Sequence, residues 1–246
     1  MKNSLLLFIS LWATTVFAQN PVYLDANGVT IKAHEWANVG DKGVVNGIEY
    51  IVADRSMLDS ALEYNEPISN YCTSRIAVMN DLFSWSQFNG DISTWDVSNV
   101  RFMSHMFAHS QFNGDISNWD VSNVTDMGGM FLESQFRREI SQWDVSNVTD
   151  MEWMFSESQF NGDISKWDVS NVKKMTYMFH RSQFRREISQ WDVSNVTIMS
   201  YMFAYSQFNG DISKWKVRKV RHCNGFSDGT FDFPKPKFKK CDCNCQ

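Results

Sequence analysis

The sequence predicts an α/β repeat solenoid of about seven 24-residue coils, each a short strand plus a short helix, and two observations predict it. One phrase, Q-F-N-G-D-I-S-N-W-D-V-S-N-V-T-D-M-G-G-M-F-L-E-S at 111–134, restarts every 24 residues without insertion or deletion. A fixed period of this size indicates stacked units rather than one closed core. Hydrophobic residues make up 43% and aromatic residues 15% of the chain, which indicates a folded protein. The six copies begin at Gln87, Gln111, Gln135, Gln159, Gln183 and Gln207.

Residues 1–18 have the features of a cleaved signal peptide. Lys2 gives a positive start, 5–17 are apolar, and Ala18 ends a small-x-Ala cleavage site. The apolar segment is too short for a spanning helix, and no later segment is long enough. We therefore expect an exported protein, cleaved after Ala18, that is secreted, periplasmic or at the cell surface and has no transmembrane segment.

Residues 19–62 predict an N-terminal capping module, followed by a degenerate first repeat at 63–86. Two Asn-Gly dipeptides, typical of hairpin turns, separate β-rich runs at 22–24, 29–33, 43–45 and 48–52. Asp54 is expected to cap a short helix. The apolar residues of that helix share one face: Met57, Leu58, Ala61 and Leu62.

Within each regular coil, at 87–222, two patterns follow one another. Aromatic and β-branched residues mixed with turn formers, as at 112–121, predict a short strand and a corner. Val124, Met127, Met130 and Phe131 have the spacing of one helix face and predict a helix of about two turns. Stacking the strands would form a parallel β ladder with coils about 4.8 Å apart.

Stacking also turns every repeat position into a column of like residues. We interpret the Trp, Phe and Met columns as core, with a solvent-facing carbohydrate strip as the alternative for tryptophan. The Trp column comprises Trp95, Trp119, Trp143, Trp167, Trp191 and Trp215. Neighbouring asparagines, as at Asn123, predict an amide ladder that satisfies backbone groups between coils.

One column stacks carboxylates, which repel one another unless each is satisfied locally. The first interpretation is a turn or cap, in which each Asp accepts from backbone N–H groups nearby. The alternative is a calcium ladder, because carboxylates are oxygen ligands for Ca²⁺; otherwise no cofactor or metal is expected. The column comprises Asp96, Asp120, Asp144, Asp168 and Asp192.

Residues 223–246 predict a C-terminal cap and a basic, Cys-rich tail. The chain has five cysteines, and in an exported protein an odd number leaves at least one that is unpaired or paired with another chain. We predict a Cys223–Cys241 disulfide that closes the cap. Disulfide-linked self-association through Cys243 or Cys245, or a soft metal at the Cys-x-Cys-x-Cys ending, are the alternatives. The basic tail is interpreted as a solvated end, with docking on an anionic polymer or cell surface as the alternative.

The pattern F-N-x-D-I-S-x-W-D-V-S-N-V-T-x-M-x-x-M-F, which stands at 112–131, closely resembles the repeat of BspA-like leucine-rich-repeat surface proteins of bacteria. The segments 27–33 and 223–227 are similar to the leader and exit segments of that family. The resemblance implies a leucine-rich-repeat-like solenoid that is exported or surface-exposed, with attachment or protein–protein binding as its task. It brings no shared catalytic residues.

Two copies depart from the pattern by carrying Arg-Arg-Glu where the others carry Asn-Gly-Asp. Their arginines are the candidate binding face, or else relieve charge between stacked acidic residues. These residues are Arg137, Arg138, Arg185 and Arg186.

Composition and motifs exclude several classes of function. The formal charge of −5 argues against a nucleic-acid-binding protein. The chain has no His-Glu-x-x-His, no phosphate-binding Gly-rich loop and no Gly-x-Ser-x-Gly turn, so we expect no catalysis. The leading hypothesis is a secreted module that binds a protein or polysaccharide. The alternative is a structural or self-assembling extracellular protein, with or without calcium stabilisation.

Overall fold

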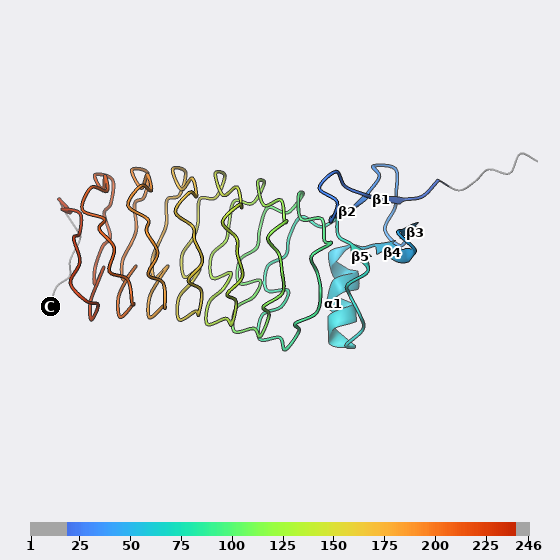
Figure 1. The fold of residues 1–246 in the computed structure, drawn as a ribbon, viewed down its shortest axis with the longest axis horizontal. Coiled ribbons are helices and arrows are strands. Elements are labelled where there is room, and N and C mark those ends of the chain that lie inside the picture. Colours follow the sequence, from blue (N-terminus) through green and yellow to red (C-terminus); the bar gives the residue numbers. More distant parts are fainter. Residues whose placement is uncertain (1–18, 240–246) are drawn as a thin grey trace, which may run out of the picture.

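A computed structural model describes residues 19–239 of the 246-residue chain. The molecule is elongated, with a small N-terminal module at one end and a row of stacked coils leading to the other end (Figure 1). The predicted signal peptide, 1–18, and the predicted disulfide partner Cys241 lie outside the described residues. No helix within 19–239 combines the length and apolar character needed to cross a membrane.

Two antiparallel hairpins form most of the N-terminal module, as the Asn-Gly turns predict. β1 (Val22–Leu24) pairs with β2 (Ile31–Ala33), and β3 (Lys42–Val45) pairs with β4 (Ile48–Val52). Asn46 and Gly47 have φ values of 53° and 80°, the left-handed backbone that a two-residue hairpin turn of this kind requires. The four predicted β-rich runs are therefore confirmed as strands, with β2 beginning two residues later than predicted.

The helix α1 (Arg55–Glu63) joins this module to the repeats. The Asp54 side chain accepts a hydrogen bond from the backbone N–H of Met57, which confirms the predicted N-cap. Leu58 and Ala61 are buried against the repeat core, so α1 covers the first coil (Figure 1). The short β5 (Tyr71–Cys72) then pairs in parallel with β4 and starts the stack.

The predicted helix of each coil is wrong: within the described residues the repeats contain no helix, and their second halves are successive tight turns. In the coil at 135–158, the N–H of Met154 donates to the carbonyl of Met151, three residues earlier. Trp153 and Glu157 have φ values of 62° and 54°, and such left-handed residues interrupt a right-handed helix. Turns of three residues reproduce the helical spacing of apolar side chains, which explains the misleading pattern.

The predicted β ladder also differs from the observed one. Apart from β5 in the degenerate first repeat, the first half of each coil forms no strand, and coils are joined by one parallel bridge each in the second half, such as Asp126 to Asp150. Alternate N–H groups nevertheless bond to the next coil: Trp153 donates to Thr176, and Phe155 donates to Met178. The backbone groups that a helix would use internally thus hold neighbouring coils together.

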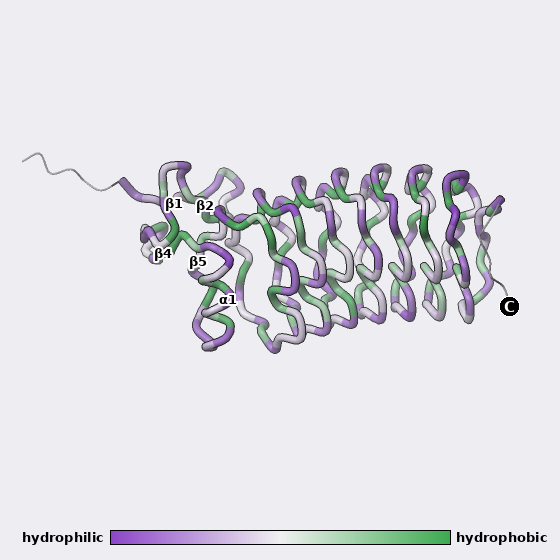
Figure 2. Tube along the Cα trace, turned by 180° about the vertical axis from the view of Figure 1, so that it is seen from behind, coloured by the Kyte–Doolittle hydropathy of each residue, from purple (hydrophilic) through white to green (hydrophobic). Residues whose placement is uncertain are grey.

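The core runs the full length of the stack as columns of identical residues. Phe131 stacks on Phe155 with ring centroids 5.7 Å apart, and the six residues of the Trp column are at most 5% exposed. Each indole N–H in the column donates to an isoleucine carbonyl 27 residues earlier, as Trp167 does to Ile140 at 3.2 Å. The tryptophan column is therefore core, and the carbohydrate-strip alternative is wrong. Figure 2 shows hydrophobic and hydrophilic residues recurring at matching places from coil to coil.

The last coil is closed by the segment that follows it. The N–H of Ile212 donates to the carbonyl of Pro234, and the Phe233 ring packs edge-on against Phe208 at 5.1 Å. Cys223, in the position of a core methionine, is buried and disulfide-bonded.

Candidate functional site

The aspartate column forms turn caps. The backbone N–H of Ser122 donates to Oδ1 of Asp120 at 3.1 Å, and the same bond recurs at 3.0–3.1 Å in the other four coils that carry the Asp-x-Ser pair. Hydrogen bonds from the side chain and backbone of Ser146 lower the pKa of Asp144 below its usual range. Among the described residues, no three His, Cys, Asp or Glu side chains gather in a metal-binding group. The contacts match the cap interpretation, and the calcium ladder has no assembled ligand set in 19–239.

The asparagine column forms the predicted amide ladder. The Nδ2 group of Asn147 donates to the carbonyl of Ser122 in the preceding coil at 2.7 Å, and Asn171 and Asn195 repeat the contact. Together the Asp and Asn columns satisfy the polar backbone along one edge of every regular coil but the last.

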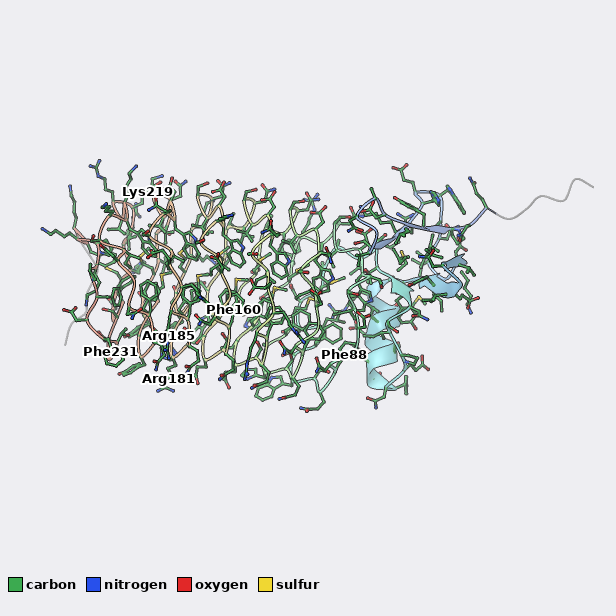
Figure 3. The ribbon with its side chains drawn as sticks, in the orientation of Figure 1. Phe88, Phe160, Arg181, Arg185, Lys219 and Phe231 are labelled. Atoms are coloured by element: carbon green, nitrogen blue, oxygen red, sulfur yellow. The ribbon has the colours of Figure 1, made fainter. Side chains whose placement is uncertain are left out.

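The four candidate arginines are all exposed, and their contacts are divided between two tasks. Nε of Arg138 donates to the carbonyl of Asn113 at 2.9 Å, and Arg186 makes the matching bond to Asn161. The pKa of Asp115 is lowered by hydrogen bonds from Ser117, with a further contribution from the positive charge of Arg138. Arg138 and Arg186 thus relieve charge and satisfy backbone. In contrast, Arg185 reaches outward to Gln207 and lies at the same edge of the molecule as Arg181 (Figure 3).

An aromatic face lies on the turns of the fourth to sixth repeats, 135–206, and we define it by six residues. Trp153 stacks on Tyr177 with centroids 3.9 Å apart, and Tyr177 stacks on Tyr201 at 4.9 Å. The His180 ring stands edge-on to Tyr177 at 5.2 Å. The aromatic face comprises Trp153, Tyr177, His180, Arg181, Tyr201 and Tyr205.

The aromatic face carries one fixed positive charge. The Arg181 guanidinium lies 5.7 Å from the centroid of Tyr205 and 3.6 Å from a Glu157 carboxylate oxygen. Burial, with a smaller contribution from Arg181, lowers the pKa of His180, so this imidazole is neutral at pH 7. Trp153 is 38% and Tyr205 57% exposed, so the face is open to solvent at both ends.

Most of these aromatic residues occupy strained backbone positions. Trp153, Tyr177, Tyr201 and Tyr205 have φ values of 56–62°, where bulky side chains are rare and cost of order 1–3 kcal/mol each. Glycine stands at the equivalent position in neighbouring coils, at 129 and 225. The repeat therefore tolerates glycine here, and nothing in the core requires an aromatic ring.

The stacking geometry decides what the aromatic face can bind. Tyr177 has a ring stacked on each of its flat faces, Trp153 on one and Tyr201 on the other, and the Tyr201 ring lies over Gly225, where an added Cβ would be 2.2 Å from it. At the centre of the face, ring edges and polar tips therefore remain for contact. Sugars stack on open ring faces, whereas Tyr, Trp and Arg side chains in partly covered surfaces are typical of protein interfaces.

Repeat geometry places this chain in the class of tandem-repeat proteins, since seven turns of chain share one continuous core and exchange hydrogen bonds at 24-residue intervals. The chain belongs to the family described as "Mycoplasma protein of unknown function, DUF285", whose model matches residues 48–138 and 132–238. A search of curated proteins and a search of solved structures each return no match to it.

Proposed function

We propose that this protein is an exported, non-catalytic binding module whose aromatic face docks a protein partner. Its architecture is proposed to be a leucine-rich-repeat-like solenoid of the kind found in BspA-like surface proteins. The observation that carries the proposal is the run of aromatic residues at left-handed positions where neighbouring coils have glycine. The backbone is left-handed at this position in every coil, so it is the choice of a bulky ring over glycine that marks this surface.

The chemistry of the aromatic face supports a protein partner. Stacked rings limit side-chain freedom before binding, so less conformational entropy is lost when a partner covers them. Arg181 and the outward-facing Arg185 add positive charge beside the rings, suited to acidic residues around an apolar patch on the partner.

A capture experiment with matched variants tests the proposal. The mature protein, immobilised, is incubated with extracellular host or community proteins, and bound proteins are identified and their affinities measured. The face variant Trp153→Gly/Tyr177→Gly/Tyr201→Gly uses the residue that the repeat already accepts at these positions. The control variant Trp36→Ser/Phe231→Ser removes two other exposed aromatic side chains.

We expect at least one protein to bind the wild type and the control at micromolar concentration or tighter and to be lost from the face variant. Equal capture by the face variant, or no bound protein at all, would contradict the proposal. Light scattering of the unbound protein separates the self-assembling alternative, which requires oligomers that persist on dilution.

A further inference from the structure

The last coil, 207–230, differs from the others in the charge of its capping edge. Where the preceding coil carries Asp192, Ser194 and Asn195, the last one carries Lys216, Arg218 and Lys219. The substitution removes the Asp-to-Ser turn cap and the amide of the Asn ladder. The Lys219 ammonium reaches back to Oδ1 of Asn195 at 2.6 Å, so only part of the old pattern survives.

Two shallow depressions adjoin on this edge and share Lys216 and Arg218. Their lining contains six cationic side chains and no carboxylate. These side chains are Lys216, Arg218, Lys219, Lys235, Lys237 and Lys239. The tail segment therefore adds three lysines to the three cationic residues that replace the cap and ladder residues, and the sequence alone does not place these two groups together.

Little on this edge neutralises the positive charge. Within the described residues, Lys235 is the only one of the six with a carboxylate in ion-pair distance, Asp232 at 3.4 Å. The nearest acidic residue of the preceding coil, Asp192, has a pKa lowered mainly by hydrogen bonds from Ser194, and then by Lys216 and Lys219. From 214 to 239 the chain has eight Lys or Arg against two Asp, an excess of six positive charges on an otherwise acidic protein.

We propose that this basic end binds an anionic polysaccharide, independently of the aromatic face. Six cations spread over two adjoining depressions match charges repeated along a polymer better than one compact anion. Among the described residues of 207–239, the exposed large apolar side chain is Phe231, which lies at the opposite edge of the molecule from Lys219 and so cannot insert into a membrane beside the basic edge (Figure 3). Trp215 lines one depression but is only 5% exposed, so it offers no ring for stacking a nucleic-acid base.

The test compares dextran sulfate with uncharged dextran as immobilised probes for residues 19–246. The edge variant Lys216→Asp/Arg218→Ser/Lys219→Asn restores the residues of the preceding coil and changes the charge by −4. The control variant Arg137→Asn/Arg138→Gly/Arg185→Asn/Arg186→Gly also restores residues of neighbouring coils and also changes the charge by −4. A second variant, Lys235→Gln/Lys237→Gln/Lys239→Gln, removes the three tail lysines that line the depressions and leaves the coil unchanged.

We expect wild type to bind dextran sulfate and not dextran, with affinity falling as salt rises because the interaction is screened. The edge and tail variants should each bind on the order of tenfold more weakly, while the control stays within about twofold of wild type. Melting curves confirm that each variant is folded.

Three results would overturn the proposal. The first is wild type that does not bind dextran sulfate, and the second is an edge or tail variant that binds as tightly as the control. The third is tighter binding to vesicles of phosphatidylcholine and phosphatidylglycerol, or to single-stranded DNA, than to dextran sulfate, which would assign the surface to another polyanion. Loss of protein capture by the aromatic-face variant has no bearing on these results, so the two proposals fail separately.

Discussion

The sixth repeat, 183–206, and the last repeat, 207–230, have nearly the same core but capping edges of opposite charge. Trp191 and Trp215 both bury their indoles and donate to an isoleucine carbonyl of an earlier coil. The polar columns differ completely, since the cap of Asp192 gives way to Lys216. Core columns maintain the stack, and the edge columns differ in charge between these two coils without a change in the core.

The largest loss of stability is expected from a core substitution in a coil that has neighbours on both sides. Trp167→Ala should destabilise the protein by about 3–5 kcal/mol, because the cavity and the lost N–H bond to Ile140 affect two interfaces. Trp215→Ala, near the end of the stack, should cost distinctly less. Denaturant unfolding of both variants checks the difference, and equal losses would contradict a stack with nearest-neighbour coupling.

A medium effect is expected from the turn caps. Asp144→Ala should cost about 1 kcal/mol, since the Ser146 N–H loses its acceptor. Lys216→Ala, at the same position of the last coil, should change stability little because no cap exists there. Thermal or denaturant unfolding of the two variants measures this difference in stability. A larger loss of stability in Lys216→Ala than in Asp144→Ala would show that the lysine has taken over the structural role of the cap.

The pH dependence of stability follows from the same caps. The pKa values of Asp144 and Asp192 are lower in the folded protein than in the unfolded chain. Their stabilising contribution is therefore fully present above the unfolded pKa of about 4 and is lost as pH falls through the folded pKa. Wild type should lose stability below about pH 4 more steeply than Asp144→Asn, as measured by urea midpoints between pH 2 and 6.

The aromatic face should show a small effect on stability. Tyr177→Gly loses stacking with Trp153 and Tyr201 but relieves a backbone strain of similar size, so the net change should stay within about 1 kcal/mol. Phe179→Gly, two residues away in the core, should unfold the coil. A loss of several kcal/mol in Tyr177→Gly would mean that the aromatic face is structural.

The smallest effect is expected from removing calcium. Because each aspartate of the column already accepts from a serine N–H, a chelator should leave the melting temperature unchanged. A clear fall in melting temperature that added Ca²⁺ reverses would restore the calcium-ladder interpretation.

Little of the aromatic face could be predicted from the repeat. Trp153, Tyr177 and Tyr201 stand at variable positions of the repeat, and nothing in the sequence pattern singles them out. The apolar spacing predicted a helix for this part of each coil. A helix has no left-handed residues, so the prediction gave no sign that these rings stack from coil to coil. Arg185 was a candidate on sequence grounds, whereas Arg138 proved to bond the backbone of the neighbouring coil.

The sequence by itself determined the period, the core columns, the hairpins and the Asp54 cap, because each depends on local residue types or on strict repetition. Only the tertiary structure shows that apolar residues spaced three or four positions apart lie in tight turns and not in a helix. The physical reason is that alternate backbone N–H groups donate to carbonyls of the next coil instead of to carbonyls of their own coil. It also decided which polar residues share one surface. Lys216 belongs to the last coil and Lys237 to the tail segment, and only closure of the last coil by the tail brings them to one edge.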